Sequence, residues 1–142
     1  MKAKKVLFVC VHNSARSQMA EAYMNRLSGG RYLAESAGLE RGTLNPYAVK
    51  VMAEDGIDIS GNVTNSVFEY FKEGRIYHYV FRVCDEQAAE RCPVFPDIIA
   101  CINWTNFPNP TNFRGTEEEI IEKNRLIRDE IKTKISEWLE TH

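Results

Sequence analysis

Near the start of the chain, a cysteine and an arginine flank five residues, at Cys10 and Arg16. A segment of this length can close around one tetrahedral anion, with a nucleophile at one end and a cation at the other. The reactive form of cysteine is the thiolate, which a neighbouring cation or a helix N-terminus favours. The planar guanidinium of Arg16 offers parallel hydrogen bonds to two oxyanion oxygens. The pair therefore predicts nucleophilic attack on a bound oxyanion.

The sequence on either side of this segment predicts the elements that position it. Residues 5–9 are apolar and β-branched, which is typical of a buried strand. Residues 18–27 have helical periodicity, with one apolar face made of Met19, Tyr23, Met24 and Leu27. The segment would therefore join a strand to a helix N-terminus, where unpaired N–H groups and the helix dipole favour an anion.

The residues inside the segment fit the same role. The predicted oxyanion-binding loop consists of Val11, His12, Asn13, Ser14, Ala15 and Arg16. Asn13 tolerates a left-handed backbone and can hold the loop open through its amide. Ser17 is placed to donate a hydrogen bond to the Cys10 sulfur. An unrelated pairing of a buried strand cysteine with a surface arginine leaves Asn13 and Ser17 unexplained.

The rest of the chain alternates strand and helix patterns. Further strands are predicted at residues 32–37, 78–83 and 98–104, and further helices at 46–54 and 67–72. A capping box from Thr116 to Glu119 opens a last helix. The apolar stripe of that helix comprises Ile120, Ile127, Ile131, Ile135 and Trp138.

This alternation predicts an α/β protein, a three-layer doubly wound fold with a four-stranded parallel sheet, in one domain spanning residues 1–142. Ligands of such sheets bind beyond the carboxyl ends of the strands. Cys10 follows the first predicted strand and Cys84 follows the third. We therefore expect both thiols on the same rim of the sheet.

The composition narrows the class of protein. With a net charge of −2, the chain lacks the excess of basic residues that is typical of proteins that bind nucleic acid or a membrane surface. No apolar run approaches the ~20 residues of a membrane span, and residues 6–11 are too short for a signal sequence. We expect a cytoplasmic monomer, and in that compartment four cysteines point to catalysis rather than to structural disulfides.

Cys84 and Cys92 form a second candidate site, on either side of a polar segment that tolerates helix. One interpretation is a zinc site, although the spacing is not that of paired zinc ligands. A second is two unrelated free thiols. A third is a redox relay, in which Cys84 attacks the Cys10 sulfur and Cys92 then attacks Cys84. Cys101 lies in an apolar strand pattern and is predicted to be a buried, inert core thiol.

Motifs spread over nearly the whole chain resemble those of thioredoxin-coupled arsenate reductases in the low-molecular-weight protein tyrosine phosphatase superfamily. They comprise residues 6–21, 35–39, 44–46, 56–60 and 92–96, with Arg125 and residues 128–131 in the last helix. The Cys-x5-Arg-Ser loop alone indicates only the superfamily. The added Cys84 and Cys92 point to its three-cysteine reductases, and the resemblance implies the phosphatase-like fold.

The resemblance also implies a mechanism and partners. Cys10 would attack arsenate held by Arg16 and the loop amides, Cys84 would attack Cys10 as arsenite leaves, and Cys92 would attack Cys84. Thioredoxin would reduce the resulting disulfide, and phosphate or sulfate would compete with arsenate. No tightly bound cofactor is expected. Some relatives hold a potassium ion near the loop, at positions that match Asn13, Glu21 and Ser36 here.

Three features depart from the family pattern. Asn109 occupies the position of the general acid, normally an aspartate, and an amide cannot deliver a proton. Cys84 and Cys92 are one residue further apart than in the reductases. Asn65 stands where some relatives have an acidic potassium ligand. Two alternatives to arsenate reduction therefore remain: a phosphotyrosine phosphatase, which Asn109 argues against, and a non-catalytic oxyanion-binding relative, which the retained cysteines argue against.

Overall fold

The computed structural model describes residues 2–142, apart from the side chain of Glu86, and is built around a four-stranded parallel sheet. Its strands are β1 (Lys4–Cys10), β2 (Tyr32–Gly38), β3 (Tyr79–Arg82) and β4 (Ala100–Asn103), in the spatial order β2-β1-β3-β4. Every neighbouring pair is parallel, so each connection must cross over the sheet. The predicted fold class is confirmed.

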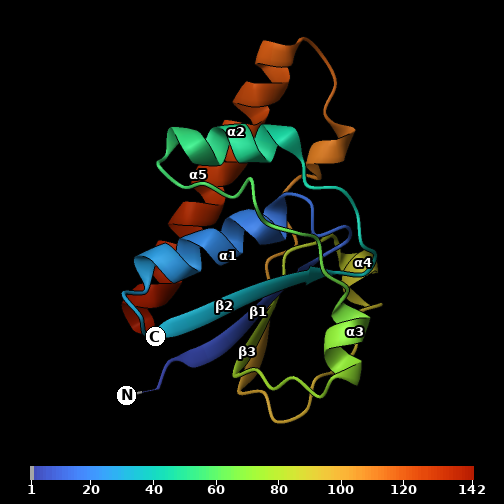
Figure 1. The fold of residues 1–142 in the computed structure, drawn as a ribbon, viewed down its shortest axis with the longest axis vertical. Helices are drawn as coiled ribbons and strands as arrows, with labels where there is room; N and C mark the ends of the chain where they lie inside the picture. Colours follow the sequence, from blue (N-terminus) through green and yellow to red (C-terminus); the bar gives the residue numbers. More distant parts are fainter. Residues whose placement is uncertain (1) are drawn as a thin grey trace.

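Helices cover both faces of the sheet (Figure 1). One side carries α1 (Arg16–Leu27) and the long α5 (Glu117–Thr141), with α2 (Pro46–Glu54) packed against α5. The other side carries α3 (Val67–Lys72), and the one-turn α4 (Glu86–Ala89) follows the end of β3. A short 3-10 turn, η1, spans Pro110–Asn112. Within residues 2–142, no helix has both the length and the apolar character required to cross a bilayer.

Aromatic packing joins α5 to the sheet. Phe8 of β1 and Phe81 of β3 stack with their ring centroids 4.8 Å apart. Trp138 of α5 meets Phe81 edge to face at 5.2 Å. The fully buried part of α5 includes Ile121 and Leu139 in addition to the predicted isoleucines at 127, 131 and 135, whereas Ile120 and Trp138 of the predicted stripe are half-buried. The predicted stripe is therefore confirmed at its three central isoleucines and is displaced by one residue at each end, to Ile121 and Leu139.

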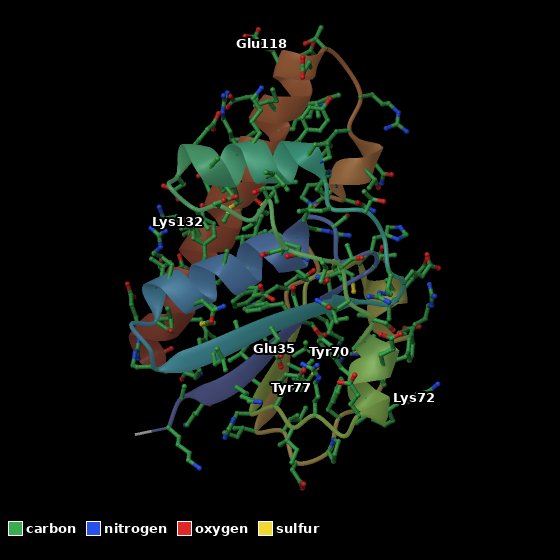
Figure 2. All side chains as sticks on the ribbon, in the orientation of Figure 1. Glu35, Tyr70, Lys72, Tyr77, Glu118 and Lys132 are labelled. Carbon is green, nitrogen blue, oxygen red and sulfur yellow. The ribbon has the colours of Figure 1, made fainter. Side chains whose placement is uncertain are left out.

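A mixed polar and aromatic cluster fills the space under α3. Glu35, Tyr70 and Tyr77 gather beside that helix in Figure 2. The guanidinium of Arg75 donates a 2.6 Å hydrogen bond to Glu35 and lies 3.8 Å from the centre of the Tyr70 ring. Phe95 meets Tyr77 edge to face at 5.3 Å. This cluster attaches the loop that follows Cys92 to the same face of the sheet.

Two sequence predictions about the core are wrong. Leu27 is 37% exposed rather than part of the apolar face, because α1 ends at this residue and the chain turns away through Gly29 and Gly30, both with positive φ. Cys101 is exposed rather than buried, because β4 is an edge strand of only four residues, Ala100–Asn103, instead of the predicted 98–104. Few elements cover an edge strand, so an apolar pattern there does not guarantee burial.

Candidate active site

The predicted oxyanion loop connects the end of β1 to the start of α1, and its carbonyl groups are turned outward. Backbone N–H groups of residues 39–45 donate to the carbonyl oxygens of Cys10, Val11, His12 and Ser14 at 2.8–3.0 Å. Because the C=O and N–H of a trans peptide point in opposite directions, this leaves N–H groups facing the inside of the loop. Such an arrangement favours a bound anion.

A close backbone approach explains why glycine stands at the end of β2. A Cβ atom on Gly38 would lie 2.7 Å from the backbone nitrogen of Asn13 and 2.7 Å from the carbonyl oxygen of Glu40. Contacts this short do not occur between unshifted atoms. Gly38 therefore permits residues 39–45 to run directly against the loop and to bind its carbonyls.

Asn13 is the centre of the buried hydrogen-bond network that holds the loop. Its backbone has a φ of 54°, as the sequence predicted for a left-handed position. Its Oδ1 accepts from the backbone N–H of Asn65 at 2.9 Å, which fixes the orientation of the amide. Its Nδ2 then donates to Ser17 Oγ at 2.7 Å and to Ser36 Oγ at 2.9 Å.

The Cys10 sulfur receives two hydrogen bonds from this network. Ser17 Oγ lies 2.9 Å from Cys10 Sγ, and the backbone N–H of Asn13 donates to the sulfur at 3.2 Å. When Cys10 is a thiolate it has no hydrogen to donate, so the Ser17 hydroxyl is then the donor in this contact. Both contacts stabilise a thiolate relative to a thiol. Cys10 itself is only 2% exposed.

Arg16 is the first residue of α1 and is buried, at 3% exposure. Its Nη1 donates to the carbonyl oxygen of Phe107 at 3.3 Å, so the loop at residues 107–112 borders the oxyanion loop. No side chain caps α1 at Ala15. The N–H groups of the first helical turn are therefore left for an anion. The remaining loop residues, Val11, His12 and Ser14, are half-buried.

Cys84 is fully buried beside this loop, two residues after β3. Burial and the negative charge of Cys10 together raise the pKa of its thiol to about 11, although the Arg16 guanidinium opposes both effects. The two thiols and the guanidinium thus share one electrostatic environment, on the rim where the sequence predicted them. An uncharged Cys84 thiol is the stable form beside an anionic Cys10.

Cys92 lies after α4 and is half-buried. Burial raises the pKa of its thiol to about 12, and the positive charge of Arg82 opposes this effect. The segment between Cys84 and Cys92 is not an open loop but contains the single turn of α4, which Asp85 caps by accepting from the Ala88 N–H at 2.8 Å. All four cysteines are free thiols. Among the residues that the structure describes, no group of three potential metal ligands occurs.

Asn109 lies in the loop that Arg16 contacts, and its side chain serves as a cap. Asn109 Oδ1 accepts from the backbone N–H of Thr111 at 3.1 Å and from its hydroxyl at 2.9 Å. The neighbouring Pro110 and Thr111 share a pocket of about 310 Å³ with Ser14 of the oxyanion loop. Residue 109 therefore lies beside the oxyanion loop, but it carries an amide in place of a carboxylic acid.

Glu21 and Ser36 extend the same hydrogen-bond network from Asn13. Ser36 Oγ donates to Glu21 Oε1 at 3.0 Å. Burial raises the pKa of the Glu21 carboxyl to about 6, although the Ser36 hydrogen bond lowers it. Asn65 donates through Nδ2 to the Ser36 carbonyl, so the amide that replaces an acidic residue takes part in the network as a donor.

Gln18 is a positioning residue that the sequence analysis missed. It is 1% exposed, although it lies on the side of α1 that carries Glu21 and Asn25, opposite Met19 and Tyr23. Its Nε2 donates to the Asn13 carbonyl at 3.0 Å and to the Val63 carbonyl at 3.1 Å, and its Oε1 accepts from Asn62. Because Gln18 falls on the polar side of the helical pattern, the periodicity gave no signal that could have revealed it.

The fold and the loop together define an oxyanion site of the phosphatase type, with a thiol nucleophile at a helix N-terminus. Residues 5–141 match the family model described as low molecular weight phosphotyrosine protein phosphatase. The chain belongs to this family.

Several proteins similar to this chain are named arsenate reductases. The arsenate reductase of Bacillus subtilis (strain 168) is 37% identical over 141 residues, which cover 99% of this chain and 99% of that protein. A solved structure of an arsenate reductase in the phosphate binding state has a TM-score of 0.75 at 28% identity, covering 97% of this chain and 98% of that one. The thioredoxin-dependent arsenate reductase Cg_ArsC1' of Corynebacterium glutamicum has a TM-score of 0.66 at 25% identity, covering 95% of this chain and 63% of that one.

Gly38→Ala tests the backbone approach that shapes the loop. The added methyl group must displace Asn13 or Glu40, and a shift near 1 Å at a binding site can cost about a hundredfold. We expect the affinity for inorganic phosphate, measured by calorimetry, to fall by about that factor. Gly61→Ala is the matched control, since no atom lies within 4 Å of its added Cβ. Equal phosphate affinity in the two variants would contradict this account of the loop.

Proposed function

We propose that this protein reduces arsenate to arsenite by a relay of Cys10, Cys84 and Cys92, and that a dithiol protein of the thioredoxin type restores the thiols. The observation that carries the proposal is the combination of a phosphatase-type oxyanion loop with a second, buried thiol at Cys84 in the electrostatic range of both Cys10 and Arg16. A phosphatase needs no such thiol. The similarity to arsenate reductases over the full chain supports the same conclusion.

The first step takes place in the oxyanion loop. Arsenate binds to the inward N–H groups and to Arg16, which exchanges its hydrogen bond to the Phe107 carbonyl for the anion. The Cys10 thiolate, held by Ser17 and Asn13, attacks arsenic. A sulfur–arsenic bond forms, and one arsenate oxygen leaves as water after taking up protons.

Two thiol exchanges complete the reduction. The Cys84 sulfur attacks Cys10, a disulfide forms, and the sulfur–arsenic bond breaks with its electron pair remaining on arsenic, which leaves as arsenite. Cys92 then attacks Cys84, so that the disulfide moves to Cys84–Cys92 and Cys10 is released as a thiolate. Burial opposes ionisation of Cys84 and Cys92, so each must lose its proton as it attacks.

An external reductant must then open the Cys84–Cys92 disulfide. Two electrons from a reduced dithiol balance the two electrons transferred to arsenic. Such chemistry requires a reducing compartment, so the proposal includes a cytoplasmic location. All residues of the relay come from one chain, and no second copy is needed.

A coupled assay tests the relay. Reduced protein is mixed with arsenate, thioredoxin, thioredoxin reductase and NADPH, and NADPH oxidation is followed. We expect arsenate-dependent oxidation that Cys10→Ser, Cys84→Ser and Cys92→Ser each abolish, because each removes one thiol of the sequence. Hydrolysis of p-nitrophenyl phosphate is measured in parallel. Hydrolysis without arsenate reduction would favour a phosphatase, and neither activity would favour an oxyanion-binding protein.

Asn109→Asp separates reduction from ester hydrolysis. An ester leaving group needs a proton, and general acid catalysis is typically worth ~10²–10⁴-fold. An aspartate can keep the cap to Thr111 with one oxygen and offer the other to a substrate. We expect p-nitrophenyl phosphate hydrolysis to rise at least about tenfold, with a smaller effect on arsenate reduction.

The matched control for this variant is Asn112→Asp, an exposed residue of the same loop that gains the same charge. A similar gain in Asn112→Asp would show that charge alone, rather than the position of the acid, changes the rate. No gain in Asn109→Asp would mean that proton supply does not limit hydrolysis.

We extend the proposal to a potassium ion beside Glu21. Glu21 offers an anionic oxygen and Ser36 a hydroxyl oxygen, both of the kind that potassium binds. The Asn13 side-chain oxygen is already occupied by Asn65 and Gln18. The ion would therefore be held mainly by Glu21, and no step of the relay depends on it.

The pKa of Glu21 gives this ion a pH dependence. Because its pKa is about 6 in the folded protein, above the ordinary 4.5, the stability that Glu21 contributes falls as the pH rises through that interval. A bound cation would offset the loss only when the carboxylate is charged. We expect potassium chloride, compared with tetramethylammonium chloride at equal ionic strength, to raise the melting temperature at about pH 7.5 but not at about pH 5. Glu21→Gln should remove the response, and a response that persists would place the ion elsewhere.

A further inference from the structure

The two thiols nearest the surface, Cys92 and Cys101, line one small cavity. Its volume is about 140 Å³, and its walls include Val80, Arg82, Phe95 and Ile98. The negative charge of Cys101 is one of the causes that raise the pKa of Cys92, so the two sulfurs also interact electrostatically. The relay proposed above ends at Cys92 and gives Cys101 no part.

The fold brings these thiols together from two directions. Cys101 is paired in register with Val80, on the edge strand β4. The loop that follows Cys92 crosses the same face of the sheet, where Phe95 is buried against Tyr77, the residue that Figure 2 places beside Glu35. Because Phe95 anchors this loop, Cys92 is held over the face of β3 and β4 on which Cys101 lies.

A guanidinium lies in the same cavity. Arg82 Nη1 donates to the Ala89 carbonyl at 2.8 Å, which fixes the side chain at the end of α4. Its Nε is buried without a hydrogen-bond partner. Its charge opposes the effect of burial on the Cys92 thiol. This fixed cation therefore offsets part of the cost that burial imposes on a Cys92 thiolate, the form in which Cys92 leaves or attacks in disulfide exchange.

The exposure of the four cysteines increases along the path away from the oxyanion loop. Cys10 and Cys84 are buried, Cys92 is half-buried and Cys101 is exposed. A reductant approaching from solvent reaches Cys101 first. Val94, which is 85% exposed, lies in the wall of the same cavity and leaves it open to solvent.

We propose that Cys101 is a fourth thiol of the relay, which receives the disulfide from Cys84–Cys92 and presents it at the surface as Cys92–Cys101. This inference rests on the proposed arsenate reduction. The Cys101 thiolate attacks the Cys92 sulfur, a bond forms between these two sulfurs, and the Cys84–Cys92 bond breaks. The electron pair leaves with Cys84, which takes up the proton that Cys101 lost, so no outside oxidant or reductant is consumed.

The exchange predicts a stoichiometry that a three-thiol relay cannot give. Each arsenate consumes two thiols. With Cys101 inert, a reduced chain without external reductant stops after one arsenite, because Cys84 is held in a disulfide. With the exchange, Cys84 is free again, so a second arsenate can be reduced as Cys10 and Cys84 form a disulfide.

The test is a reductant-free experiment. Reduced protein is freed of reducing agent, mixed with excess arsenate and stopped, and arsenite is counted per chain. We expect about two arsenites for the native chain and about one for Cys101→Ser, since four thiols supply two reductions and three supply one. Asn103→Ser, an exposed position two residues along the same strand, is the matched control and should give about two.

Peptide mapping of a single-turnover sample identifies the bond directly. Trypsin leaves Cys92 and Cys101 on one peptide, residues 92–114, and Cys84 on another, residues 83–91. After one equivalent of arsenate, we expect peptide 92–114 to be lighter by two hydrogens and not joined to peptide 83–91. In Cys101→Ser, the two peptides should be joined.

The outcomes are distinct. About one arsenite from the native chain, with peptides 83–91 and 92–114 joined, would overturn the role of Cys101 and leave the three-thiol reductase intact. Arsenite from neither the native chain nor Cys101→Ser would overturn the reductase itself, and this inference with it. Two arsenites from the native chain and one from Cys101→Ser would establish the fourth thiol.

Discussion

The outward turn of the loop carbonyls is the constraint on which the rest of the site depends. Residues 39–45 bind the carbonyl oxygens of the loop from outside, and the Asn13 side chain ties the loop from inside to β2 and to the chain at Asn65. An N–H-lined loop is unstable when its carbonyls lack partners, because buried backbone groups must be paired. The anion site is therefore formed before any anion arrives, which is how electrostatic preorganisation acts.

Burial divides the thiols into two kinds. Cys10 is buried, but it is surrounded by donors that favour its charged form. Cys84 is buried with too little compensation from the Arg16 guanidinium, so its pKa rises to about 11 and it stays protonated until an electrophilic sulfur forms beside it. In the same low-dielectric interior, Cys10 is thus held as a reactive thiolate and Cys84 as an unreactive neutral thiol. This difference protects Cys84 from reaction with solvent oxidants before the substrate is bound.

The sequence predicted the features that are determined by neighbouring residues in the chain. It missed those that depend on where a residue lies in the folded protein. The strand–loop–helix around Cys10, the helices at 46–54 and 67–72 and the capping box at Thr116 all follow from nearby residues, and all are present. The exposure of Cys101 depends on which strand occupies the sheet edge. The role of Gln18 depends on Asn62 and Val63, which lie more than forty residues away. Neither could be derived from periodicity.

The amide at Asn109 has a consequence for the loop that Arg16 contacts. An aspartate in this position would accept hydrogen bonds from Thr111 more strongly as a charged carboxylate than as a protonated acid. The amide of Asn109 accepts from Thr111 in the same way at every pH. The hydrogen bonds that hold the shape of this loop at residue 109 therefore do not depend on the acidity of the surroundings.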